Sequence, residues 1–170
     1  MIEVRKATVA DYKLLSVLGR RAFQEAFGQF NDPGDMQTYL DLSFDLERIK
    51  SQLEDPSVIY LVANYHNEPV GYAKLVTNAT TQYADVANQM QLERIYALGA
   101  YVGKKIGKAL MLHIIELSRQ AGFHYLWLSV WQQNDRAIKF YKDFGFEIIG
   151  VKEFFIGKEV NDDYVMGLKL

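Results

Sequence analysis

A run of glycines and lysines, Gly103-Lys104-Lys105-Ile106-Gly107-Lys108, follows a predicted strand and opens a stretch with helical periodicity. Backbone N–H groups in the first turn of a helix lack internal partners, and the helix dipole places partial positive charge there. Lysines are disfavoured at that end unless an anion offsets their charge, so the run predicts binding of a polyanion such as a pyrophosphate. A solvated, charged helix start is the alternative. The spacing matches neither a Walker loop nor a dinucleotide fingerprint.

A second segment combines a helix cap with aromatic side chains. Asn134 stands at a predicted helix start, Tyr141 lies inside that helix, and Gly145 follows it. Asparagine is a preferred N-cap residue, and glycine commonly ends a helix. Asn134 is therefore either a cap alone or a cap that also reaches a ligand. Tyr141 is either a core aromatic or a hydroxyl available for chemistry.

These two segments resemble the signature motifs of the GNAT N-acetyltransferases. The second signature of that family, Asn-x-x-Ala-x-x-Phe-Tyr-x-x-x-Gly-Phe, is matched at every fixed position from Asn134 to Phe146. The first, Gln/Arg-x-x-Gly-x-Gly/Ala, is matched at Gly107 but departs at Val102 and Lys105. Within the family the chain is most similar to bacterial polyamine N-acetyltransferases of the Pai type, on runs that include Glu93-Arg94-Ile95-Tyr96 and Trp127-Leu128-x-Val130-Trp131.

The resemblance implies acetyl-CoA as the cofactor and direct attack of an amine in a ternary complex. It places Tyr141 beside the cofactor sulfur. It makes Glu93 the candidate base, because an amine with a pKa of about 10.4 must lose a proton before it attacks. Broken alternation around Glu93 predicts a β-bulge that aims its side chain, and an ion pair with Arg94 or a lysine is the alternative. Cofactor binding is implied for Ile95, Tyr96, Ala97, Gly103, Lys104, Lys105, Ile106, Gly107, Lys108, Asn134 and Tyr141.

Aromatic and acidic side chains in the first third of the chain form the candidate acceptor site. Substrate binding is predicted for Phe27, Phe30, Asp32 and Tyr39. These rings, with that of Phe44, would pack on the methylenes of an amine. A solvated acidic helix face is the alternative explanation for the acidic residues. The carboxylates that would attract a polyamine are Glu25, Asp32, Asp35, Asp41 and Asp45.

The elements that must position these residues alternate in type. A first strand and three helices precede residue 57. A hairpin over 58–77, a strand at 90–98, a helix at 103–121, a strand at 125–130, a helix at 135–144 and a strand pair at 147–155 and 163–170 follow. This order predicts an α/β (α+β) fold with a mixed central sheet of about 6–7 strands flanked by about 4–5 helices. The resemblance implies the GNAT-like acyl-CoA N-acyltransferase fold.

The composition limits the remaining possibilities. The chain has 170 residues, is 49% hydrophobic, contains no cysteine and carries a net charge of −2. We expect one domain over 1–170, with acceptor-site helices in 1–57 and the acetyl-CoA-binding core in 90–146. The charge argues against a nucleic-acid partner, and the lack of a long apolar run argues against a membrane span. The charged start favours a cytoplasmic protein. The three histidines have no ligand spacing, so no metal is expected. The aromatic side chains expected in the core are Trp127, Phe140, Phe144, Phe146 and Phe155.

The predicted function is an acetyl-CoA-dependent N-acetyltransferase that acetylates a primary amine of a small molecule, for which the resemblance suggests a polyamine. Two alternatives remain open. One is a non-catalytic, CoA-responsive regulatory module, and the other is a protein or peptide lysine acetyltransferase. A small-molecule amine is the expected partner, and a homodimer is the candidate assembly.

Overall fold

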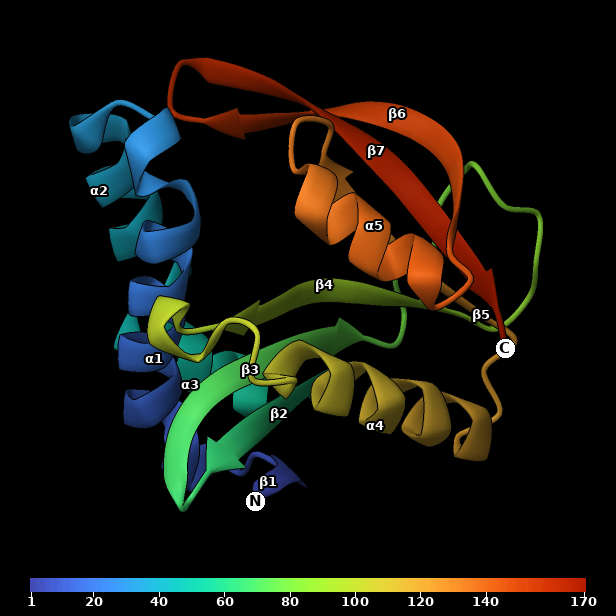
Figure 1. The fold of residues 1–170 in the computed structure, drawn as a ribbon, viewed down its shortest axis with the longest axis horizontal. Helices are drawn as coiled ribbons and strands as arrows, with labels where there is room; N and C mark the ends of the chain where they lie inside the picture. The colour runs from blue at the N-terminus through green and yellow to red at the C-terminus, as the bar shows by residue number, and fades with distance from the viewer.

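Seven strands form one mixed sheet in the computed structural model, which describes residues 1–170 (Figure 1). The strand order is β1-β2-β3-β4-β5-β7-β6, with β4 and β5 parallel and every other neighbouring pair antiparallel. The predicted mixed sheet is confirmed. The strands are β1 (Ile2–Lys6), β2 (Val58–Tyr65), β3 (Glu68–Val76), β4 (Gln89–Ala97), β5 (Tyr125–Trp131), β6 (Glu147–Ile156) and β7 (Glu159–Lys169).

Five α-helices flank the sheet: α1 (Tyr12–Phe27), α2 (Pro33–Ser43), α3 (Leu46–Glu54), α4 (Ile106–Gln120) and α5 (Asp135–Asp143). Their starts follow local chemistry, because Asp32, Asp45 and Asn134 each accept a hydrogen bond from a backbone N–H in the first turn. The 3₁₀ turns η1 (Val9–Asp11), η2 (Gly28–Phe30) and η3 (Gly99–Tyr101) complete the connections. The helix predicted from Gly103 begins three residues later, at Ile106.

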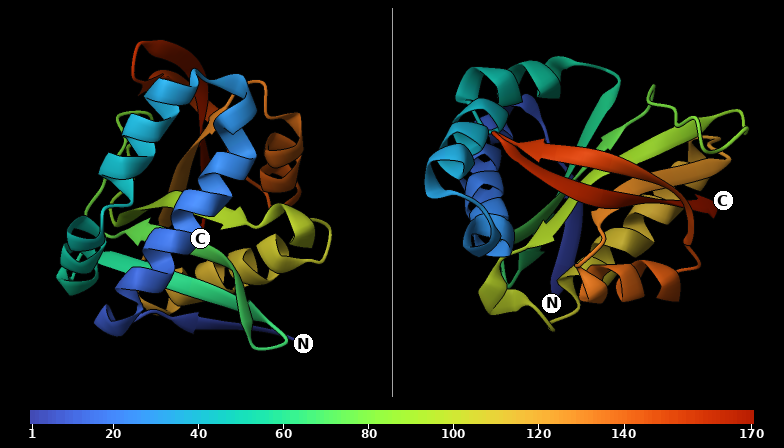
Figure 2. Two further views of the ribbon diagram at one scale, coloured as in Figure 1. Left: turned by 90° about the vertical axis from the view of Figure 1, so that its left-hand side faces the viewer. Right: turned by 90° about the horizontal axis from the view of Figure 1, so that it is seen from above.

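The sheet divides into two halves at the junction of β4 and β5. These strands pair only from Gln89 to Gln91, against Tyr125 to Trp127. Beyond Gln91 they separate, so β6 and β7 lie above β2–β4 in Figure 1. The tip of the β6–β7 hairpin reaches α2, where the Asp32 amide donates to a Glu159 carboxylate oxygen at 2.8 Å (Figure 2). The separation leaves one edge of β4 open over most of its length.

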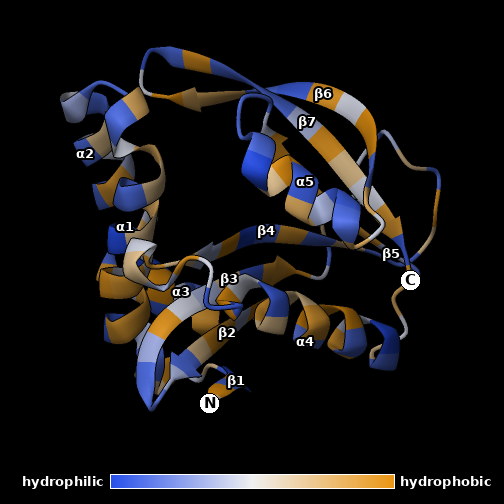
Figure 3. Cartoon of the chain, in the orientation of Figure 1, coloured by the Kyte–Doolittle hydropathy of each residue, from blue (hydrophilic) through white to orange (hydrophobic).

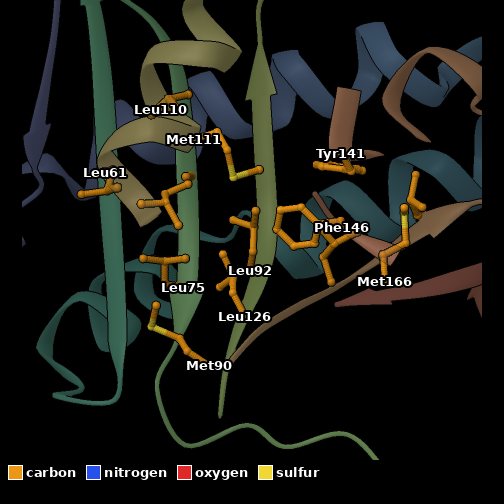
Figure 4. Close-up of a cluster of buried hydrophobic side chains, with 14 of the residues drawn as sticks. Leu61, Leu75, Met90, Leu92, Leu110, Met111, Leu126, Tyr141, Phe146 and Met166 are labelled. Atoms are coloured by element: carbon orange, nitrogen blue, oxygen red, sulfur yellow. The ribbon is translucent and has the colours of Figure 1, made fainter. Parts of the chain in front are cut away.

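Each face of the sheet has its own core. α4 and α5 cover one face, where 18 buried residues cluster; Figure 4 shows members from Leu61 on β2 to Met166 on β7. Bands of hydrophobic and hydrophilic colour alternate along α4, as expected for a helix with one buried side (Figure 3). α1, α2 and α3 cover the opposite face with 14 buried residues. One aromatic expectation is wrong, because Phe155 is 55% exposed. Trp127 is buried as expected, in a small core cluster with Tyr125 and Val165.

Candidate active site

The turn before α4 leaves donors free at the start of the helix. The N–H groups of Ile106, Gly107 and Lys108 make no backbone hydrogen bond. Gly103 has φ +86°, and Lys105 adopts the left-handed conformation with φ +67°. Lys105 occupies the slot that is glycine in the first GNAT signature, and a side chain in this conformation costs roughly 1–2 kcal/mol. The backbone therefore retains the turn that glycine would favour and presents its N–H groups to an anion.

A single large cavity of about 890 Å³ runs from this helix start to α1, α2 and α3. Its walls come from β4 and α4 on one side and from β5, α5, β6 and β7 on the other. The structure thus gathers almost all of the predicted site in one place. The predicted residues that line the cavity are Phe27, Phe30, Tyr39, Glu93, Ile95, Tyr96, Ala97, Gly103, Lys105, Ile106, Gly107, Lys108, Asn134 and Tyr141.

Two predicted site residues do not line the cavity. The Lys104 N–H donates to the Tyr101 carbonyl, and its ammonium lies 5.4 Å from the centre of the Tyr65 ring. Asp32 is the exposed N-cap of α2, where its carboxylate accepts from the Asp35 N–H at 2.9 Å. Both residues have local structural roles, which the sequence pattern does not distinguish from ligand binding.

The open edge of β4 forms a backbone wall of the cavity. Ile95, Tyr96 and Ala97 pair with β3 on one side, while β5 has already separated on the other. Backbone groups on such an edge can bind an extended, amide-containing chain in the manner of an added strand. The wall leads to the α4 start, so these two elements fit an amide arm followed by phosphates.

Asn134 and Tyr141 face this wall from α5. The Asn134 Oδ1 accepts from the Ala137 N–H at 3.3 Å, while the rest of its carboxamide remains available to the cavity. Tyr141 is 8% exposed and packs edge-on against the rings of Phe140 and Phe146. Burial raises the pKa of Tyr141 above its ordinary value. The neutral hydroxyl is therefore the stable form, and it can donate a hydrogen bond.

Glu93 occupies the predicted bulge. Lys74 of β3 pairs with Arg94 and the next residue, Leu75, pairs with Leu92, which leaves Glu93 as the extra residue of β4. Its side chain is 33% exposed and lines the cavity. The carboxylate forms an ion pair with the Lys74 ammonium, and the Arg94 Nε lies 3.9 Å away. The bulge and the ion pair, posed as competing explanations, thus occur together.

Aromatic rings line the end of the cavity formed by α1 and α2, where the acceptor site is expected. Phe23 of α1 stacks on Tyr39 of α2 at 4.8 Å between ring centres, and Phe30 lies 5.0 Å from Trp131 of β5. Phe44 is only 2% exposed and lies outside the lining, which corrects the expectation that it contacts the acceptor. The Arg94 guanidinium instead lies 4.7 Å from the centre of the Phe44 ring, in a cation–π contact.

The carboxylates expected to attract a polyamine lie elsewhere. None of the five lines the cavity. Glu25 accepts from the Gly99 N–H at 2.7 Å, and Asp41 pairs with Arg20 on the outer surface. Asp35 accepts from the Lys158 N–H of the β6–β7 turn at 3.3 Å, and Asp45 caps α3. The helices point these side chains toward neighbouring backbone or solvent.

Several charged and polar residues of the lining belong to neither sequence motif. Lys74, Arg94 and Asp163 are buried or half-buried on three different strands, and Ser129 lies on a fourth. The Arg94 Nη1, the Ser129 Oγ and the Asp163 Oδ1 are buried without hydrogen-bond partners. Burial raises the pKa of Asp163 to about 6. For Lys74, the sequence does offer a signal of a functional position, because it is the one charged residue in the apolar run Val70–Val76. Long-range strand pairing gave no comparable local signal for the others.

Comparison with known proteins identifies the class that this fold and cavity define. The family model described as the acetyltransferase (GNAT) family matches residues 20–146. The chain therefore belongs to the GNAT family: it is an N-acetyltransferase, and acetyl-CoA is its cofactor. No group of side chains suited to a metal ion occurs, and no helix is both long and apolar enough to cross a bilayer.

Individual relatives cover nearly the whole chain. An uncharacterised N-acetyltransferase of Lactobacillus delbrueckii subsp. lactis is 25% identical over 166 residues, 97% of this chain and 95% of that one. A spermidine N(1)-acetyltransferase of Thermoplasma acidophilum is 22% identical over 151 residues, 86% of this chain and 89% of that one. The crystal structure of the PaiA N-acetyltransferase from T. acidophilum, in complex with coenzyme A, superimposes with a TM-score of 0.80 at 22% identity, covering 100% of this chain and 99% of that one.

Proposed function

We propose that this protein transfers the acetyl group of acetyl-CoA to a primary amine of a small molecule by direct attack in a ternary complex. The observation that carries the proposal is the continuity of one cavity. It joins the free N–H groups of α4, the open edge of β4, the Tyr141 hydroxyl and an aromatic pocket at α1 and α2. A donor bound at one end would meet an amine bound at the other without a covalent enzyme intermediate.

The cofactor would bind along the walls contributed by residues 90–146. Backbone donors from Ile106 to Lys108 suit its pyrophosphate, with the ammonium groups of Lys105 and Lys108 nearby, and the β4 edge suits its pantetheine arm. When bound, acetyl-CoA supplies an activated thioester. Residues 1–57 would contribute the facing acceptor walls within a single domain over 1–170.

Glu93 would receive a proton from the incoming ammonium, directly or through a water. An amine with a pKa of about 10.4 is almost fully protonated at neutral pH, so proton removal must precede attack. Lys74 restrains the Glu93 carboxylate, and the bulge directs it into the cavity. We infer that the ion pair positions Glu93 while leaving one carboxylate oxygen for the proton.

Tyr141 would donate a hydrogen bond to the departing sulfur. A tyrosine hydroxyl has a pKa of about 10 and a thiol about 8.5, so complete proton transfer is uphill by roughly 2 kcal/mol. Burial raises the pKa of Tyr141 and makes complete transfer less favourable still. The hydroxyl is therefore assigned to hydrogen bonding rather than to full proton donation.

Thiol release from acetyl-CoA over a panel of amines tests the proposal. We expect release to depend on a small primary amine and the product to be its N-acetyl derivative by mass spectrometry. Binding of acetyl-CoA by calorimetry without turnover on any amine would favour a CoA-responsive module instead. Activity restricted to lysine peptides would favour a protein acetyltransferase. Absence of binding would overturn the proposal and the module together.

A polyamine belongs in that panel because one relative is named as a spermidine N(1)-acetyltransferase. Turnover of spermidine above that of simple amines would support the same acceptor here. The displaced acidic residues described above give this choice no support from the cavity itself.

A further inference from the structure

The acceptor half of the cavity carries more positive than negative charge. Away from the α4 start, its lining contains the cations Arg48, Lys74, Arg94 and Lys152 against the two carboxylates Glu93 and Asp163. The lysines at the α4 start and Arg136 at α5 lie at the cofactor end and are not part of this count. A polycation would meet an excess of like charge in this half.

Three of these cations, Arg48, Lys74 and Arg94, gather around the Glu93 bulge. Lys74 is 7% exposed and already forms an ion pair with Glu93. Burial lowers the pKa of Lys74, and the nearby positive charges of Arg94 and Arg48 add to that effect against the opposing Glu93 charge. The Glu93 carboxylate is therefore the one negative charge among three neighbouring cations, Lys74, Arg94 and Arg48. Removing charges from water without a counter-charge is costly, so this end of the cavity is electrostatically complementary to an anion.

Two of these cations have unused hydrogen-bonding capacity. The Arg94 Nη1 is buried without a partner, while its Nη2 donates to the Tyr39 hydroxyl at 3.1 Å. Arg48 of α3 lines the cavity and forms no ion pair. A guanidinium binds a carboxylate through two parallel N–H donors, and Arg48 is exposed enough to adopt that geometry.

We propose that the acceptor is an amine that also carries a carboxylate, and that Arg48, with Lys74 and Arg94 behind it, binds this carboxylate while the amine faces Glu93. The inference rests on the proposed function and specifies its substrate class. Asp163 is the other acidic group of this half, on the opposite wall, and its unpartnered Oδ1 would add to the negative charge that Glu93 presents to the ammonium end. The cavity would thereby hold both charges of a zwitterion.

Acceptors matched in length but different in end group provide the test. Each series contains an ω-amino acid, the corresponding n-alkylamine and the corresponding diamine, for example 4-aminobutyrate, butylamine and 1,4-diaminobutane, extended over chains of three to six carbons. We expect kcat/KM to be highest for the amino acid in at least one series, by about tenfold over the alkylamine, with the diamine lowest. A diamine preference, or equal values within every series, would overturn the inference.

The variant Arg48→Gln localises the effect, since this exposed residue can change without disturbing the core. We expect it to lower the ratio of kcat/KM for the amino acid to that for the alkylamine by about tenfold, through KM. Arg119→Gln, at an exposed arginine of α4 outside the cavity, should leave that ratio unchanged. An unchanged ratio in Arg48→Gln would refute the assignment. Failure of every amine to release thiol would instead refute the proposed function, so the two failures remain distinct.

Discussion

Replacing Tyr141 by phenylalanine removes one oxygen from the cavity and leaves the ring packed between Phe140 and Phe146. A hydrogen bond to a charged group is worth about 1.5–3 kcal/mol, and a tenfold rate change corresponds to about 1.4 kcal/mol. If the hydroxyl stabilises the departing thiolate only in the transition state, kcat should fall by about 10- to 150-fold. A full general acid would make the loss about 10²- to 10⁴-fold, which the burial-raised pKa of Tyr141 argues against.

The assay is thiol release at saturating acetyl-CoA and amine, with acetyl-CoA affinity measured separately by calorimetry. We expect the affinity to change little, because the bond forms as the sulfur departs. Tyr125→Phe is the matched control, since Tyr125 is 6% exposed in a different cluster and does not line the cavity. A kcat of Tyr141→Phe equal to that of Tyr125→Phe would refute the role given to the hydroxyl.

Three further predictions concern the other charged groups. Glu93→Gln should lower kcat by about 10²-fold near pH 7, and the deficit should shrink toward pH 10 as the amine loses its proton unaided; an equal deficit at all pH values would indicate a structural role only. Lys108→Gln should weaken CoA binding about two- to fivefold at low salt in calorimetry and leave binding of pantetheine, which lacks the phosphates, unchanged; equal losses for both would contradict a phosphate contact. Burial raises the pKa of Asp163 from 3.8 in the unfolded chain to about 6 in the folded protein. The ionised carboxylate therefore destabilises the folded protein fully above about pH 7 and hardly at all below about pH 4. Asp163→Asn should therefore raise the free energy of unfolding by up to about 3 kcal/mol at pH 7 and little at pH 4, as measured by urea denaturation, and a gain independent of pH would contradict this assignment.

Local chemistry made much of the fold predictable. The cap at Asn134 and the glycine at Gly145 are short-range signals, and each works as the sequence predicts. The bulge at Glu93 was also predictable, because the break in the apolar–polar alternation of the strand occurs among adjacent residues of the sequence.

The acceptor end was far less predictable. Which way an acidic side chain points depends on the face that its helix buries, so Asp41 could not be separated from a ligand by composition. Lys74 and Asp163 enter the same cavity from strands on opposite sides of the β4–β5 junction, which only the assembled sheet determines. For the same reason, Phe44 is buried although it was expected at the acceptor site, and Phe155 is exposed although it was expected in the core.

The short β4–β5 ladder has a thermodynamic consequence. Three residue pairs alone join the two halves of the sheet by strand pairing, so relative opening of the halves breaks few hydrogen bonds. A ligand that contacts both walls of the cavity binds only the closed arrangement, and mass action then stabilises it. At a free ligand concentration about 100 times its dissociation constant, that gain is about 2.7 kcal/mol. A cofactor bound across both walls as proposed would therefore stabilise the junction with the fewest paired residues in the sheet.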